Sequence, residues 1–155
     1  MKKIDLGQTI QILANVGVIA GIVFLAIELR QAQLVGRSQV RNEITLGYLE
    51  LYLNDMHMDD RTLALTAGGV DEPLSDADRT RLNIWGNAWF RIWENAFYQY
   101  RQGLFDEEEF RAASAGLRGR VNTTPRLRDR FCRGRENLSA GFVGYVDSLL
   151  DVPCN

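Results

Sequence analysis

Residues 10–29 read IQILANVGVIAGIVFLAIEL, and this run decides the fold. Its polar side chains are those of Gln11, Asn15 and Glu28. A helix of about 20 residues extends over about 30 Å, the thickness of the hydrocarbon core of a bilayer. Gln11 and Glu28 lie near the two ends of such a helix, where polar groups can reach water. The run therefore predicts an N-terminal lead and transmembrane helix over residues 1–29, followed by a helical extramembrane domain over residues 30–155.

Two other interpretations of the same run stay open. A cleaved signal peptide would need small residues before the cut, and Val18-Ile19-Ala20 could serve. Its apolar segment would then be interrupted by Gln11 and Asn15. The other alternative is a helix buried in the core of a soluble protein. We favour the retained membrane helix because the run is long enough for a complete span.

Small residues recur along this helix at Ala14, Gly17 and Gly21. Small residues at four-residue spacing allow a second helix to approach closely, and in lipid such packing drives association. Glycine is also common in membrane helices for other reasons. The stripe predicts contact with the transmembrane helix of another membrane protein subunit.

The remainder of the chain shows helical periodicity and no alternating strand pattern of useful length. Ser75 is placed to cap a long helix that ends near Gln102, with Gly103 as its stop. Asp106 can cap the next helix, and Pro125 suits the first turn of another. The sequence thus predicts an all-α protein, in which one transmembrane helix continues into a small helical bundle.

The long helix carries an aromatic residue at every fourth position, at Trp85, Trp89, Trp93 and Phe97. A helix that is apolar over so wide an arc is expected at the centre of its bundle. Core packing is therefore the favoured interpretation, since each ring buries a large area. The alternative is an aromatic pocket for a pigment, a quinone or a lipid.

The positive charge is concentrated in one segment, although the net charge of the whole chain is −2. Residues 111–135 contain eight arginines, opposed within the later part of the segment by Asp129. We expect five of them to contact anionic lipid headgroups or an acidic partner; they are Arg126, Arg128, Arg130, Arg133 and Arg135. A solvated basic face is the alternative. Nucleic acid is a disfavoured partner because Phe131 is the segment's one aromatic and offers no stacking platform.

The chain has two cysteines, Cys132 and Cys154, and one histidine, His57. The cysteines can form one disulfide on an oxidising side of a membrane, or remain thiols in the cytoplasm. A single histidine cannot build a His-based zinc site. No Ser-His-Asp set, P-loop or dinucleotide motif is present. The sequence therefore predicts no catalytic residue, no cofactor and no metal.

The run from Val18 to Gln31 resembles an uncharacterised family of small bacterial inner-membrane proteins. In that family an apolar N-terminal helix ends in a Leu-Ala-x-x-x-Arg-Gln pattern, matched here by Leu25, Ala26, Arg30 and Gln31. The segments Tyr100-Arg101-Gln102-Gly103 and Tyr145-Val146-Asp147 are similar to its middle and its tail. The resemblance implies a bacterial single-pass protein of the inner membrane and no assigned activity.

Basic residues give a small preference for one orientation in that membrane. Lys2 and Lys3 precede the apolar run, whereas Arg30, Arg37 and Arg41 follow it. The positive-inside rule therefore favours a cytoplasmic extramembrane domain, with both cysteines as thiols. A periplasmic domain with a disulfide is the alternative.

These observations lead to an expected function and one alternative. We expect a non-catalytic accessory or structural subunit of a larger bacterial membrane protein complex, respiratory or photosynthetic. The alternative is a membrane-tethered ligand-binding or enzymatic helical domain with an aromatic pocket.

Overall fold

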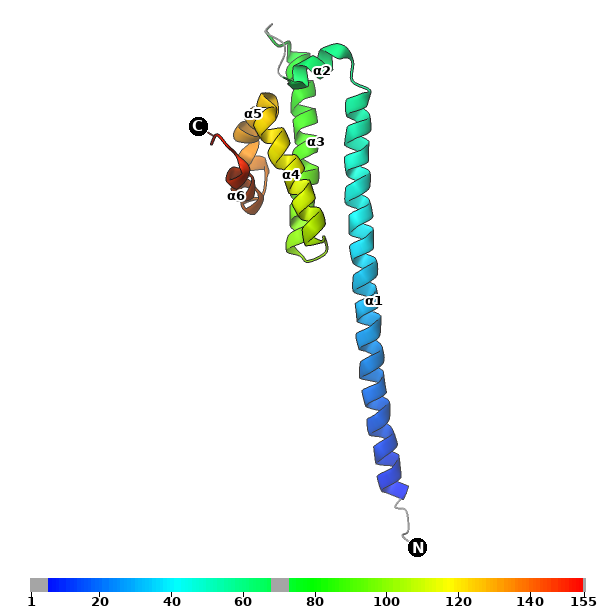
Figure 1. Cartoon of the computed structure of the whole chain (residues 1–155). Helices are drawn as coiled ribbons and strands as arrows, with labels where there is room; N and C mark the ends of the chain where they lie inside the picture. The colour runs from blue at the N-terminus through cyan, green and yellow to red at the C-terminus, as the bar shows by residue number, and fades with distance from the viewer. Residues whose placement is uncertain (1–5, 68–72, 155) are drawn as a thin grey trace. The chain divides into compact units, whose positions relative to one another are not determined.

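The computed structural model describes residues 6–67 and 73–154, and every regular element in this part is helical. In chain order these are α1 (Leu6–Met56), α2 (Asp60–Ala67), α3 (Asp76–Arg101), α4 (Glu107–Thr123), α5 (Pro125–Gly134), a 3₁₀ turn (Arg135–Asn137) and α6 (Ala140–Leu149) (Figure 1). The predicted all-α fold, with a long N-terminal helix that continues into a helical bundle, is confirmed.

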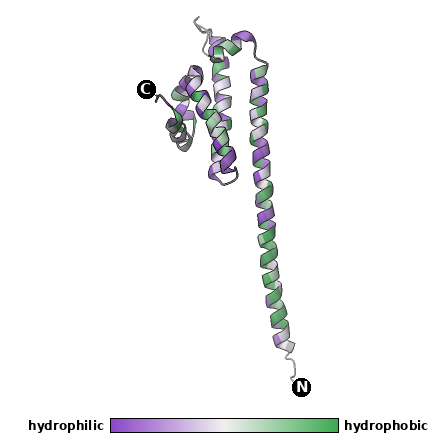
Figure 2. Cartoon of the chain, in the orientation of Figure 1, coloured by the Kyte–Doolittle hydropathy of each residue, from purple (hydrophilic) through white to green (hydrophobic). Residues whose placement is uncertain are grey.

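The chain forms two compact units, Met1–Ser38 and Gln39–Asn155. In the first, α1 is long and apolar enough to cross a membrane, and it is the one such helix in the described part of the chain. Figure 2 shows this apolar run along the N-terminal half of α1. Residues 7–35 are all exposed. The large apolar side chains of the run therefore require a cover that this unit does not supply.

The helix ends of the second unit follow the predicted caps. Ser75 and Asp78 form a capping box at the start of α3, in which the Asp78 amide donates to Ser75 Oγ at 3.1 Å. Asp106 Oδ1 accepts from the Glu108 amide at 2.8 Å at the start of α4. Gly103 has a φ of +71°, a left-handed conformation that favours glycine, directly after α3. Local chemistry therefore fixes these boundaries.

The main core of the second unit lies along α3, which packs against α4, α5 and α6. Its largest fully buried side chains include Trp89, Phe131 and Phe142. A smaller buried cluster joins Ile44 of α1 to Ala96, Phe105 and Phe110. The prediction that the aromatic helix is central to the bundle is confirmed.

Within this unit, the C-terminal part of α1 packs onto α3 through a glycine. The Ile92 side chain lies directly over Gly47, where any side chain on residue 47 would overlap it. The next residue of α1, Tyr48, lies 6.3 Å from Trp89 between ring centroids. These contacts bring the aromatic residues of α1 onto the tryptophan face of α3.

A buried carboxylate joins α2 to α3 and makes the stability of the domain sensitive to acid. Asp78 is only 3% exposed and accepts hydrogen bonds from Arg61 Nη2 at 3.0 Å and Ser75 Oγ at 2.8 Å. These bonds, first that from Arg61, lower the pKa of Asp78 to about 2. The usual pKa of an unfolded aspartate is about 3.9. The stabilisation by Asp78 is thus complete above about pH 4 and is lost as the pH falls through 2.

We expect Asp78→Asn to lower the thermal unfolding midpoint at pH 6, because the variant loses the charged partner of Arg61. The difference from the unchanged protein should shrink between pH 4 and pH 2, where the aspartate itself becomes protonated. Near-ultraviolet circular dichroism of the full chain in detergent measures both midpoints. A difference that stays constant from pH 6 to pH 2 would contradict this linkage.

Candidate ligand-binding cleft

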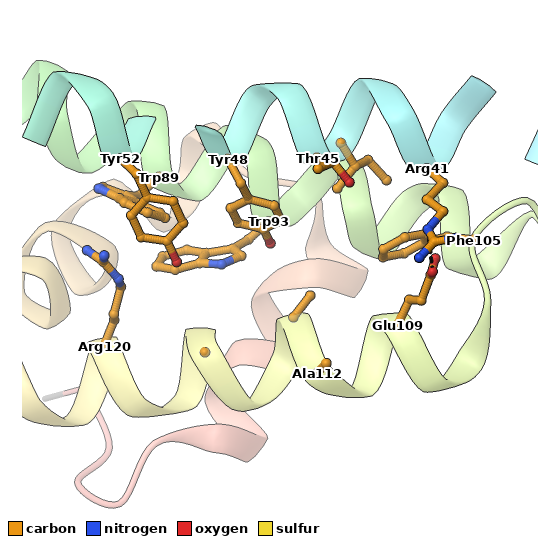
Figure 3. A pocket seen from close by; sticks show the side chains of 13 residues that line it. Arg41, Thr45, Tyr48, Tyr52, Trp89, Trp93, Phe105, Glu109, Ala112 and Arg120 are labelled. Carbon is orange, nitrogen blue, oxygen red and sulfur yellow. Dashed lines mark ion pairs between the residues drawn. The ribbon is translucent and has the colours of Figure 1, made fainter. Parts of the chain in front are cut away.

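A cleft of about 370 Å³ lies within the second unit between α1, α3 and α4 (Figure 3). Its lining is mainly apolar and aromatic in the middle and charged at the ends. The residues that line it are Arg41, Ile44, Thr45, Tyr48, Tyr52, Trp89, Trp93, Phe105, Glu109, Ala112, Ala113, Gly116 and Arg120.

Aromatic rings form the base of the cleft and its wall on α1. Trp89 and Trp93, one turn apart on α3, have ring centroids 5.1 Å apart. Tyr52 meets Trp89 edge to face at 5.4 Å. Figure 3 shows the rings of Tyr48 and Tyr52 reaching from α1 toward the two indoles. Trp89 and Trp93 are almost fully covered by neighbouring side chains, whereas Tyr52 is 47% exposed and offers an accessible apolar ring to a flat molecule.

The opposite wall is open because α4 presents small residues there. Ala112, Ala113 and Gly116 contribute little or no side-chain volume. A Cβ atom built on Gly116 meets nothing within 4 Å. The cleft therefore arises from a specific pairing of large side chains on α1 and α3 with small ones on α4.

Charged residues mark the two ends of the cleft. At one end Arg41 Nε lies 2.5 Å from Glu109 Oε1, so that an ion pair joins α1 to α4. At the other end the Arg120 guanidinium lies 3.9 Å from the centre of the Trp89 ring. Arg120 also lies 3.6 Å from Asp55 Oδ2, while Asp55 Oδ1 accepts from Trp85 Nε1 at 2.8 Å. A bound molecule would thus meet a cation above an indole at one end and an ion pair at the other.

Two buried polar atoms of the cleft residues have no hydrogen-bond partner within the described part of the chain. They are the Tyr48 hydroxyl and Trp89 Nε1. Burial raises the pKa of Tyr48 above its usual range, so the hydroxyl stays neutral and keeps its proton. Such groups are costly to bury alone, by about 1–3 kcal/mol each. A hydrogen-bond acceptor that reached the Tyr48 hydroxyl would remove part of that cost.

The favoured interpretation of the tryptophan repeat, core packing, holds for Trp89 and Trp93, whereas a pocket that holds a ligand stays a prediction. Trp89 and Trp93 belong to the buried core, and both also line the cleft. Trp85 is only partly buried and lines a second cavity of about 440 Å³ with His57 and Met58. The small face of α4 and the position of Arg120 over the Trp89 ring were not predicted from the sequence. The spacing of Ala112 and Gly116, one helical turn apart, was the available signal.

The five arginines expected to contact lipid or a partner do not form one surface. Arg130 donates to Asn87 Oδ1 from Nε at 3.0 Å and from Nη2 at 2.5 Å. Arg135 forms a bidentate ion pair with Asp147, in which Nη1 donates to Oδ1 at 2.7 Å and Nη2 donates to Oδ2 at 2.5 Å. Arg133 forms an ion pair with Asp129. Arg126, Arg130 and Arg133 share one hollow, which Arg128 and Arg135 do not line. Whether any of them contacts lipid stays a prediction.

The two cysteines form a disulfide. Cys132 of α5 is bonded to Cys154, with the Cα atoms 5.5 Å apart. Both side chains also pack against the main core. The structure therefore has the disulfide that was the alternative to the two thiols expected with a cytoplasmic domain. The bond fastens the segment after α6 to α5.

The small residues of the apolar run lie along an exposed helix. Ala14, Gly17 and Gly21 are exposed, and a Cβ atom built on either glycine meets nothing within 4 Å. Their contact with another subunit stays a prediction. Among residues 6–67 and 73–154, no three His, Cys, Asp or Glu side chains gather closely enough to hold a metal ion.

Comparison with protein-family models, curated proteins and solved structures finds no match for this chain. The function of the chain is therefore inferred from the geometry of the cleft and of the surrounding helices.

Proposed function

We propose that the chain is a single-pass, non-catalytic protein of a bacterial inner membrane that binds a small ligand in the cleft between α1, α3 and α4. The observation that carries this proposal is the volume of about 370 Å³ between the aromatic residues of α1 and α3 and a face of small residues on α4. Ligand sites in proteins typically have about 300–1,000 Å³ and a largely apolar lining with a few polar groups. The ligand class that fits is a flat, mainly apolar molecule with a hydrogen-bond acceptor.

The disulfide supports a domain on the outer side of that membrane. Disulfides form and persist in the periplasm, whereas cytoplasmic thiols are kept reduced. Cys132 and Cys154 are bonded to each other. The opposite preference, for a cytoplasmic domain, rests on only one more basic residue after the apolar run than before it. We therefore assign the domain to the periplasm.

A matched pair of glycines on α4 tests the cleft. Gly116 lines it and Gly119 does not, yet a Cβ atom at either position meets nothing within 4 Å. We expect Gly116→Leu to fill the cleft and Gly119→Leu to leave it open. Both changes remove a helical glycine, so their effects on helix stability should be similar.

The full chain in lipid nanodiscs is titrated with 1,4-naphthoquinone, a flat molecule with two carbonyl acceptors, and tryptophan fluorescence is recorded. The quenching should saturate for the unchanged protein and for Gly119→Leu. The apparent affinity of the Gly116→Leu variant for the quinone should be lower by a factor of about ten or more, which corresponds to a loss of about 1.4 kcal/mol of binding free energy. Equal titration curves for the two variants would refute binding in this cleft.

An exposed apolar stripe favours a second function, that of an accessory subunit in a membrane protein complex. Leu46, Leu49, Leu53 and Met56 are exposed along one side of α1 within the second unit. Their spacing of three and four residues is that of a helix-packing seam. Migration of this chain with other subunits on a native gel, after gentle solubilisation of the membranes, would support this function. Migration as a free monomer would count against it.

A further inference from the structure

A second site lies between α3 and α5, away from the aromatic cleft. A hollow of about 360 Å³ is lined by four arginines, Arg79, Arg126, Arg130 and Arg133, and by one carboxylate, Asp129. Such a concentration of positive charge is unusual in a chain with a net charge of −2. Bringing like charges together costs free energy, so the arrangement calls for a compensating anion.

The side chain of Arg130 is held in a fixed position within this hollow. Asn87 Oδ1 accepts from both its Nε and its Nη2. Two glycines make room for it, since a Cβ atom on Gly86 would lie 2.8 Å from Arg130 Cγ and one on Gly134 would lie 2.6 Å from Arg130 Nη1. Asn87 is neutral, so it orients the guanidinium without cancelling its charge. Fixing a binding group in advance lowers the cost of binding.

The charges of the other arginines are only partly compensated. Arg79 Nη2 donates to the Leu74 carbonyl at 2.6 Å, which is again a neutral acceptor. Its nearest carboxylate, that of Asp76, lies 3.7 Å away and is fully exposed. Arg133 pairs with Asp129. Arg126 forms no ion pair among the residues that the structure describes. The hollow therefore keeps an excess of positive charge.

We propose that this hollow binds a phosphate group, carried either by an anionic lipid headgroup or by a free phosphate. Guanidinium groups match the geometry of phosphate oxygens and bind them through paired hydrogen bonds. Arg126 and Arg133 approach the anion from α5, while Arg79 approaches from α3, and Arg130 supplies the oriented group between them. This site is independent of the aromatic cleft and of its ligand.

Phenylglyoxal, which modifies accessible arginines, tests the site on the full chain in phosphatidylcholine nanodiscs. Modification of each arginine is followed by mass spectrometry in inorganic phosphate and in chloride at equal ionic strength. At phosphate near ten times Kd, Arg126 and Arg133 should react about tenfold more slowly, because the site is empty for about a tenth of the time. Arg128 lies on the same helix outside the hollow and should react equally in both salts.

Nanodiscs that contain phosphatidylglycerol distinguish the two sources of the phosphate group. If the headgroup occupies the hollow, Arg126 and Arg133 are protected there in chloride alone; if free phosphate is the ligand, they are protected only after phosphate is added. The Arg130→Lys variant keeps the positive charge but loses the planar guanidinium with its paired donors. It should therefore reduce the protection of Arg126 and Arg133 with either source of phosphate. Equal rates in phosphate and chloride, or protection of Arg128 to the same degree, would overturn the proposal.

Discussion

Replacing Phe131 by alanine is expected to lower the free energy of unfolding of the domain by about 3–5 kcal/mol. Phe131 is fully buried and lies 5.5 Å from Phe90 between ring centroids, so it joins α5 to α3. Its truncation removes apolar burial and leaves a cavity that the neighbouring helices can close only in part. The expected loss is a large fraction of the stability of a typical domain.

Denaturant titration of the full chain in detergent, followed by tryptophan fluorescence, measures this loss. Tyr98→Ala provides the control, because Tyr98 is an aromatic residue of α3 that is 57% exposed. Its truncation should change the free energy by no more than about 0.5 kcal/mol. Similar losses in the two variants would show that α5 is not packed on α3 through Phe131.

Removal of the disulfide, by replacing Cys132 and Cys154 together with serine, should lower the free energy of unfolding by about 3 kcal/mol. The bond joins residues 22 positions apart, and the loop that it closes restricts the unfolded chain. The loss is measured by the same denaturant titration. Treating the unchanged protein with a reductant should produce a similar decrease, while the double serine variant should not respond to the reductant.

Thiol labelling of intact cells with a membrane-impermeant maleimide tests the same bond in place. With a periplasmic domain, labelling should appear only after reduction and without lysis. Labelling that requires lysis, and that needs no reductant, would show that the cysteines are cytoplasmic thiols. That result would contradict both the disulfide and the proposed orientation.

Those parts of the fold that depend on neighbouring residues were predictable from the sequence. The caps at Ser75 and Asp106 involve partners two or three residues away, and the apolar run needs only its own composition. The central place of α3 followed from the repeat of tryptophans. In each case the physical cause lies within one helix or one helix end.

The cleft and the contacts of the arginines depend on residues far apart in the sequence. The small face of α4 becomes a cavity wall only because α1 supplies Tyr48 and Tyr52 opposite it. Arg130 donates a hydrogen bond to Asn87, which is 43 residues away in the sequence, and Arg135 donates to Asp147, which is 12 residues away. A count of charges along the chain does not show which arginines have hydrogen-bond or ion-pair partners within the fold. The sequence therefore predicts one continuous basic surface, whereas in the structure several of these arginines bind other side chains.

The contacts of Asp55 and Gly47 set the angle of α1 about its own axis within the second unit. Asp55 holds Trp85 on one side and faces Arg120 on the other, while Ile92 fits against Gly47 about two turns earlier. A rotation of this segment about its axis would have to break the Trp85–Asp55 hydrogen bond, separate the Arg120–Asp55 ion pair and displace Ile92 from Gly47 at the same time. Rotation of this part of α1 about its axis is thereby resisted. The exposed stripe therefore keeps a fixed orientation relative to α3; it consists of Leu46, Leu49, Leu53 and Met56.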